Sequence, residues 1–171
     1  MARRRARLLL VLLMVGAAGC SNASPLMRSS AASHGGSATT ATEASSAESV
    51  YLEQLGAEQA RLSAAEARIP TSPRTPAALA RSVGLLGIAV RRLADGLAEI
   101  QAPASVASEH AHLVAIMRSY AVALDRAARI AVTSGGEPRA GRLLIAATNQ
   151  ASRAFTSTIA SIDSTLGGSA S

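Results

Sequence analysis

The sequence predicts an all-α protein, a four-helix up-down bundle preceded by a disordered tether. Apolar residues recur at spacings of three and four across residues 50–166, which is the period of one face of a helix. No stretch alternates apolar and polar residues as a half-buried strand does. Prolines and glycines divide the segment into four helices joined by short turns. An antiparallel bundle is the simplest arrangement for such helices.

The first twenty residues are predicted to be an export signal. Four arginines at positions 3–7 precede an apolar run at 8–18, which is too short to cross a membrane as a helix. A basic start, a short apolar run and small residues before a cleavage point are typical of secreted proteins. The end of this segment, Ala17-Ala18-Gly19-Cys20, resembles the lipobox of bacterial lipoproteins.

The lipobox resemblance implies a lipid anchor on Cys20, the only cysteine of the chain. In that family the peptide before the cysteine, here residues 1–19, is removed. The cysteine then carries a diacylglyceryl thioether and usually an acylated amine, with fatty acids such as palmitate. The expected location is the extracytoplasmic face of the cell membrane, with the lipid as the membrane contact. An ordinary signal peptide cut near Gly19 would instead leave Cys20 as a free thiol.

The net charge of the expected mature chain is small. Removing the four arginines of the signal leaves 13 arginines against 11 acidic residues, a net charge of +2. This surplus predicts no cluster of positive charge of the kind that nucleic acid requires, so nucleic acid is not an expected partner. Every basic residue is arginine, which excludes a lysine nucleophile or Schiff base.

Composition divides the expected mature chain into three parts. Residues 20–49 are rich in Ser, Ala, Thr and Gly, which predicts a disordered tether because they offer little apolar surface to bury. Residues 50–166 form the predicted bundle domain, and residues 167–171 a disordered tail. The first helix is expected to bury Leu52, Leu55, Leu62 and Ile69 on one face and to end before Pro70 and Pro73.

The second helix has the most regular pattern, with successive apolar residues spaced by four and three. Thr75 is placed to cap it and Pro76 suits its first turn. Residues 83–90 are apolar all round, which predicts that other helices surround them, and Gly84 and Gly87 would allow close approach. The expected buried face consists of Leu79, Val83, Leu86, Val90, Leu93, Leu97 and Ile100.

The third and fourth helices show the same kind of pattern. Pro103 separates the second helix from the third, residues 133–136 end the third, and Pro138 begins the fourth. The expected inner face of the third helix is Val106, His110, Leu113, Met117, Tyr120 and Leu124. That of the fourth is Leu144, Thr148, Ala151, Phe155, Ile159, Ile162 and Leu166.

Few residues of the domain suit chemistry. Glu109 and His112 form a Glu-x-x-His pair one turn apart, which di-metal bundles use twice, but here no second copy exists. His110 lies on the apolar face, and we expect it to be partly exposed near the helix end with one ring nitrogen bonded to backbone or water. Haem ligation by His110 would need a methionine from another helix, whereas Met117 lies on the same one.

The sequence therefore favours a lipid-anchored helical domain that binds or scaffolds an envelope protein partner, with no enzyme activity and no cofactor. No Gly-x-Ser-x-Gly elbow and no phosphate-binding loop ending in Lys-Ser or Lys-Thr occurs. The alternative is a metal- or haem-handling bundle centred on Glu109, His110 and His112.

Overall fold

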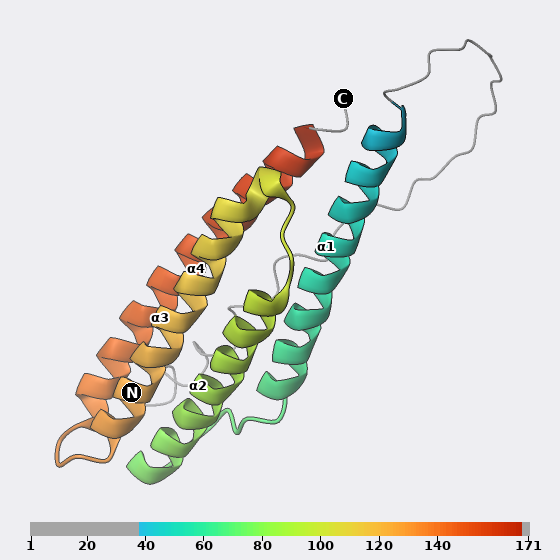
Figure 1. Cartoon of the computed structure of the whole chain (residues 1–171). Helices are drawn as coiled ribbons and strands as arrows, with labels where there is room; N and C mark the ends of the chain where they lie inside the picture. The colour runs from blue at the N-terminus through green and yellow to red at the C-terminus, as the bar shows by residue number, and fades with distance from the viewer. Residues whose placement is uncertain (1–37, 169–171) are drawn as a thin grey trace.

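The computed structural model describes residues 38–168, which fold into four α-helices and one short 3-10 helix, η1 (Figure 1). Successive α-helices run in opposite directions, and no strand occurs in this part of the chain, so the predicted all-α up-down bundle is confirmed. The bounds are α1 Ala38–Glu66, α2 Pro76–Glu99, η1 Ala104–Val106, α3 Ala107–Ala131 and α4 Glu137–Gly168. Within 38–168, no helix has the length and apolar character needed to span a membrane.

Helix α1 begins earlier than the composition predicts. Residues 38–49 are helical, whereas the composition predicted a disordered tether up to residue 49. Residues 46, 47, 49 and 50 are all exposed and Glu48 is half-buried, so packing contributes little to this turn. Instead, alanine and glutamate extend a helix that is already formed and packed farther along, because adding a residue to an existing helix needs no new nucleus. The signal, Cys20 and residues 20–37 of the predicted tether lie outside the described residues.

The buried face of α1 differs from the predicted one. Tyr51 is fully buried whereas Leu52 is 45% exposed, so the expected role of Leu52 in the core is wrong. The inner positions are Tyr51, Leu55, Glu58 and Leu62, spaced by four, three and four. The apolar pattern missed this register because a tyrosine and a glutamate occupy two of its positions.

Helix α2 follows the prediction at its start and along its inner face. Thr75 Oγ1 accepts a hydrogen bond from the Ala78 backbone N–H at 3.1 Å, and Pro76 occupies the first turn. This cap satisfies a backbone donor that has no partner within the helix. All seven predicted inner residues are buried or belong to the partly buried shell of the core.

The outer side of α2 contradicts the expectation that other helices surround residues 83–90. Leu85 and Ile88 are 43% and 45% exposed. A Cβ added at Gly84 would meet nothing within 4 Å, so this glycine serves no close approach. A Cβ at Gly87 would lie 2.9 Å from Asp125 Oδ1 and 3.5 Å from Leu124 Cβ, so α2 and α3 do pack closely there.

Helix α3 packs against both α2 and α4, and its predicted inner residues lie in the core. The inner line of α4 is also confirmed at Leu144, Ala151, Ile162 and Leu166, which are buried. Helix α4 continues to Gly168, so the predicted tail begins within its last turn. Residues 169–171 are not described.

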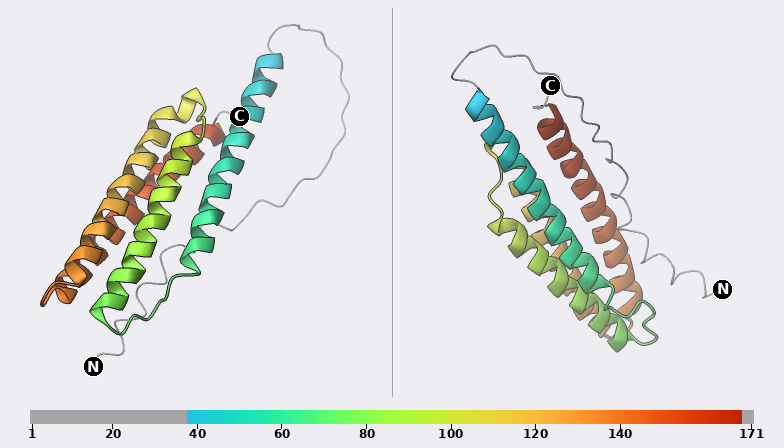
Figure 2. Two further views of the ribbon diagram at one scale, coloured as in Figure 1. Left: turned by 60° about the horizontal axis from the view of Figure 1, so that its bottom comes forward. Right: turned by 90° about the vertical axis from the view of Figure 1, so that its right-hand side faces the viewer.

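The bundle has two distinguishable ends. The loops at 67–75 and 132–136 lie together at one end, which we call the loop end (Figures 1 and 2). At the other end, a small apolar cluster joins α1, η1 and α4 through Tyr51, Val106, Ile162 and Leu166. The backbones of α1 and α4 do not approach each other closely, so the contact between these two helices is made by their side chains.

Candidate functional site

The Glu-x-x-His pair lies on the surface at the start of α3. Glu109 and His112 line a shallow groove of about 370 Å³ between α3 and α4, and the residues opposite are Ala154, Ser157, Thr158 and Ser161. Ser108 Oγ donates a hydrogen bond to Glu109 Oε2 at 2.7 Å, and this bond is the main reason why the pKa of Glu109 is lowered. The groove thus contains one carboxylate and one imidazole, facing hydroxyl groups.

His110 points into the protein instead. It is only 7% exposed, so the expected partial exposure is wrong, whereas the expected bond to backbone is present. Nε2 lies 2.9 Å from the Leu97 carbonyl oxygen, and Nδ1 lies 3.2 Å from the Tyr51 hydroxyl. A carbonyl can only accept, so Nε2 carries a proton; in the neutral ring the Tyr51 hydroxyl then donates to Nδ1. The Tyr51 and His110 rings also pack edge to face, with their centroids 5.6 Å apart.

This geometry separates the three candidate metal ligands. Both ring nitrogens of His110 have partners in the protein, while His112 faces the α3–α4 groove. Within residues 38–168 no group of three His, Cys, Asp or Glu side chains is arranged to hold a metal ion. Met117 is buried in the core on the same helix as His110. Glu109 and His112 supply two ligands, fewer than the three protein ligands of a typical zinc site.

The structure brings together three partly buried polar side chains, those of Tyr120, Thr148 and Glu66, which the sequence analysis did not consider as a set. The Tyr120 hydroxyl lies 3.0 Å from Thr148 Oγ1, across α3 and α4. Burial raises the pKa of Tyr120, and the charge of Glu66 on α1 raises it further. Burial likewise raises the pKa of Glu66. Tyr120 and Thr148 stand on the two predicted inner faces, so their pairing could have been inferred from the helical register.

Glu58 is a charged residue at an inner position of α1. It is 9% exposed and forms an ion pair with Arg61. A Cβ at Gly96 of α2 would come within 2.5–2.9 Å of the Glu58 carboxyl group. The missing side chain of Gly96 therefore leaves the space in which the Glu58 carboxylate lies.

Charge is divided between two halves of the bundle. We call residues 61–92 and 118–153 the basic half, which includes the loop end, and residues 46–60, 93–117 and 154–166 the acidic half. The basic half holds twelve arginines against three carboxylates (Glu66, Asp125 and Glu137), a formal net charge of +9. All twelve arginines are exposed. The acidic half, as described here, holds seven carboxylates and no arginine.

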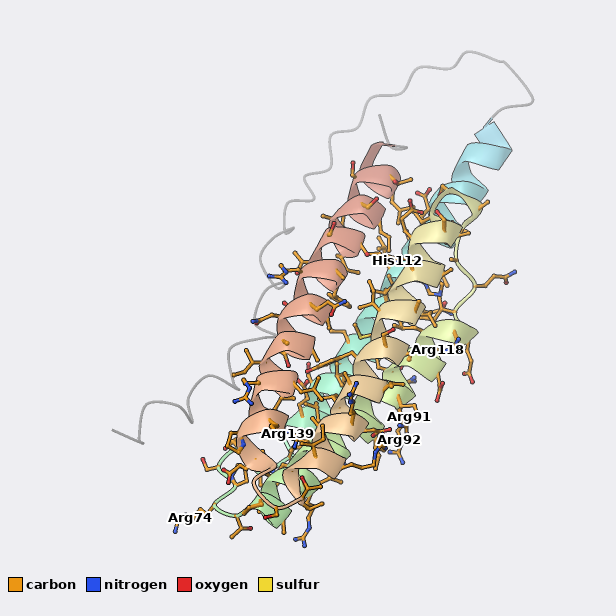
Figure 3. All side chains as sticks on the ribbon, turned by 90° about the vertical axis from the view of Figure 1, so that its left-hand side faces the viewer. Arg74, Arg91, Arg92, His112, Arg118 and Arg139 are labelled. Atoms are coloured by element: carbon orange, nitrogen blue, oxygen red, sulfur yellow. The ribbon has the colours of Figure 1, made fainter. Side chains whose placement is uncertain are left out.

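Contacts between helices place this boundary at one height across the bundle. Glu58 of α1 lies against Gly96 of α2, and His110 of α3 bonds to Leu97 of α2, all within the acidic half. On the other side of the boundary, Arg91 of α2 forms an ion pair with Asp125 of α3. In Figure 3 the labelled arginines all lie on the loop-end side of His112, and Arg74 lies at the loop end itself. The small net charge of the chain thus conceals an uneven distribution of arginine along the bundle, and the expectation of no nucleic-acid partner stays a prediction.

Helix stability does not account for the whole of this division of charge. A helix favours acidic residues at its N-terminus and basic residues at its C-terminus. Glu109 and Arg129 at the two ends of α3 follow this preference. Glu99 at the end of α2 and Arg139 in the first turn of α4 have the opposite signs, so the preference accounts for only part of the division. A surface selected for stability and solubility alone would also intersperse the two signs, because like charges repel.

Exposed large apolar residues concentrate in the same region as the arginines. Of the seven on the described surface, five belong to the basic half: Leu85, Ile88, Val122, Val132 and Ile145. Val50 and Leu52 belong to the acidic half. Arginine beside exposed apolar side chains is a composition enriched in protein interfaces. No protein-family model matches the chain, and comparisons with curated proteins and with solved structures find no similar one.

Proposed function

We propose that this protein is a membrane-anchored, extracytoplasmic lipoprotein whose helical domain acts by binding an acidic protein partner in the envelope. The resemblance of residues 17–20 to a lipobox supports the anchor on Cys20. One observation carries the binding function, namely that all arginines of the folded domain gather in one half of the bundle.

The basic half is suited to recognising carboxylates. A guanidinium group presents a planar fork of donors that matches a carboxylate, and it remains charged at any pH of interest. Twelve such groups on one half create a positive potential that attracts and orients acidic partners. The apolar residues among them, such as Leu85 and Ile88, supply surface that a protein partner can bury.

The direction of α1 puts the basic half at the end of the bundle opposite Ala38, and this arrangement supports the proposal. The chain that leads to Cys20 joins α1 at Ala38, at the end of the bundle opposite the loop end. The acidic half therefore lies nearer the point of attachment. A binding surface at the loop end is the part of the domain least hindered by the chain that tethers it.

The proposal is tested by binding of fluorescently labelled poly-L-glutamate to residues 21–171. We expect Arg126→Gln/Arg129→Gln to weaken binding about three- to tenfold at low salt, because two charges of the basic half are lost. The matched control, Glu53→Gln/Glu99→Gln, removes two charges from the acidic half and should bind at least as well as the wild type. Equal weakening by both variants, or no binding by the wild type, would contradict the proposal.

A further inference from the structure

The two halves of the bundle are complementary in charge to each other. The basic half has a formal net charge of +9, and the acidic half, over its seven carboxylates, −7. We infer that the acidic partner of the basic half is the acidic half of a second copy of this chain, in an antiparallel side-by-side pair. This inference rests on the proposed function and names the partner of the same surface.

The position of the charge boundary supports a pair with two-fold symmetry. The boundary lies at one height on the helices, between Glu58 and Arg61 on α1 and between Arg92 and Asp95 on α2. A half-turn about an axis through this height, perpendicular to the bundle, brings each half beside its opposite. Both complementary contacts then form at once, as in the self-complementary interfaces of most homodimers.

Exposed apolar residues occur on both halves of the two neighbouring helices α1 and α2. Val50 and Leu52 of α1 are exposed in the acidic half, and Leu85 and Ile88 of α2 are exposed in the basic half. Val50 and Leu52 stand two residues apart and lie on opposite flanks of α1, so only one of them can face the partner. In the antiparallel pair, that residue lies near the height of the α2 residues of the other copy. An apolar centre with a charged surround is the usual composition of a protein interface. The α1–α2 side is therefore the side proposed to make the contact.

The same charges could also join copies end to end, but that arrangement is less well supported. An end-on contact would use the end of the bundle at which the chain enters α1. It would also leave the exposed apolar residues of α1 and α2 uncovered, because these lie on the sides of the helices. A side-by-side pair covers Leu85, Ile88 and one of the two exposed apolar residues of α1, and it leaves the entry point of α1 free.

The first experiment measures the mass of residues 21–171 by sedimentation equilibrium as salt is varied. We expect dimers in about 20 mM NaCl and a dissociation constant at least about tenfold higher in about 500 mM NaCl, because salt screens exposed charges. A monomer at low salt would overturn the inference. A mass that grows beyond the dimer with concentration would show end-to-end association and would also overturn the antiparallel pair.

Charge reversal then tests which halves meet. Arg81→Glu/Arg92→Glu makes part of the basic half acidic, and Glu53→Arg/Glu99→Arg makes part of the acidic half basic. Each variant alone should dimerise more weakly than the wild type, because the reversed residues then meet residues of their own sign. Their equimolar mixture should form a tighter heterodimer, because the reversed residues of one variant then meet the oppositely charged residues of the other. The conservative variant Arg81→Lys/Arg92→Lys keeps the charges and should still dimerise.

The outcomes distinguish this inference from the proposed function. If the wild type is monomeric but binds poly-L-glutamate through its basic half, the acidic partner is another protein and only the inference fails. If the mixture of reversed variants does not associate although both variants are folded by circular dichroism, the antiparallel pair is wrong. If the wild type neither dimerises nor binds poly-L-glutamate, the proposed function fails as well.

Discussion

The bond between Tyr51 and His110 joins α1 to the rest of the bundle, and its removal is a sensitive test of the structure. Tyr51 is 1% exposed, and its hydroxyl is the partner of His110 Nδ1. Tyr51→Phe keeps the ring and the apolar contacts but leaves a buried acceptor without a donor. Such a group costs about 1–3 kcal/mol. For a domain of this size, we expect the melting temperature to fall by about 3–10 °C.

Tyr120→Phe is the matched control for this prediction. The Tyr120 hydroxyl also has one side-chain partner, Thr148, but both residues are partly exposed, so water can replace the lost bond. We expect a loss below about 1 kcal/mol. Thermal and urea unfolding followed by circular dichroism would measure both variants. The reasoning is refuted if Tyr51→Phe is no more destabilising than Tyr120→Phe.

A double-mutant cycle with His110→Leu isolates the pairwise contribution. The Leu97 carbonyl keeps a second donor, the Ile100 backbone N–H at 3.1 Å, so its loss of the His110 bond is partly compensated. Replacing both Tyr51 and His110 by apolar residues should cost less than the sum of the single changes, with a coupling of about 0.5–3 kcal/mol. Additive effects would mean that the two side chains do not interact in solution.

Four further predictions follow from the lipobox resemblance, the core, the glycines and the titration of Tyr51. Cys20→Ser should leave uncleaved precursor and abolish fatty-acid labelling; unchanged labelling would exclude the anchor. Leu93→Ala should cost about 2–5 kcal/mol by urea unfolding, because the side chain is buried in the α2 seam. Gly136→Ala should cost more than about 1 kcal/mol, since its Cβ would overlap the Ile130 carbonyl, whereas Gly84→Ala, into open space, should stabilise by up to about 1 kcal/mol. Burial raises the pKa of the Tyr51 hydroxyl from 10.0 to about 12. The stability that the neutral hydroxyl contributes is therefore complete below pH 10 and is lost as the pH rises toward 12. In Tyr51→Phe, the free energy of unfolding should fall less steeply over this pH range than in the wild type.

The helices were predictable because their pattern repeats over many residues. The buried line from Leu79 to Ile100 needs only the period of a helix and a single core, and the cap at Thr75 needs only local hydrogen bonding. Predictions that depended on the neighbours of one residue were less accurate. Leu52 is exposed because Tyr51 reaches the cluster between α1 and α4, and no feature of the local sequence contains that contact.

His110 shows the same limit within the candidate site. Its place on the inner face of α3 was evident from the spacing, but its burial depends on two partners distant in sequence, Tyr51 and Leu97. Glu109 and His112 do share a surface, as their spacing of three predicts. The spacing within α3 does not tell which residues of α4 face Glu109 and His112, so it could not predict whether α4 adds a third metal ligand. The structure places Ser157, Thr158 and Ser161 opposite them.

The sequence by itself determined that the domain is helical, where three of its four helices begin, and which apolar residues of α2 face inward, because these properties depend on neighbours within one or two turns. Only the tertiary structure decided how charge is distributed. The arginines of the described residues occupy two blocks, 61–92 and 118–153, separated by a block of 25 residues without arginine. Antiparallel packing folds the chain back at 67–75 and 132–136, which brings both blocks to one end and their acidic neighbours to the other. A small net charge therefore becomes two strongly charged halves, since net charge is a sum over the chain whereas the field at a surface depends on where the helices place each group.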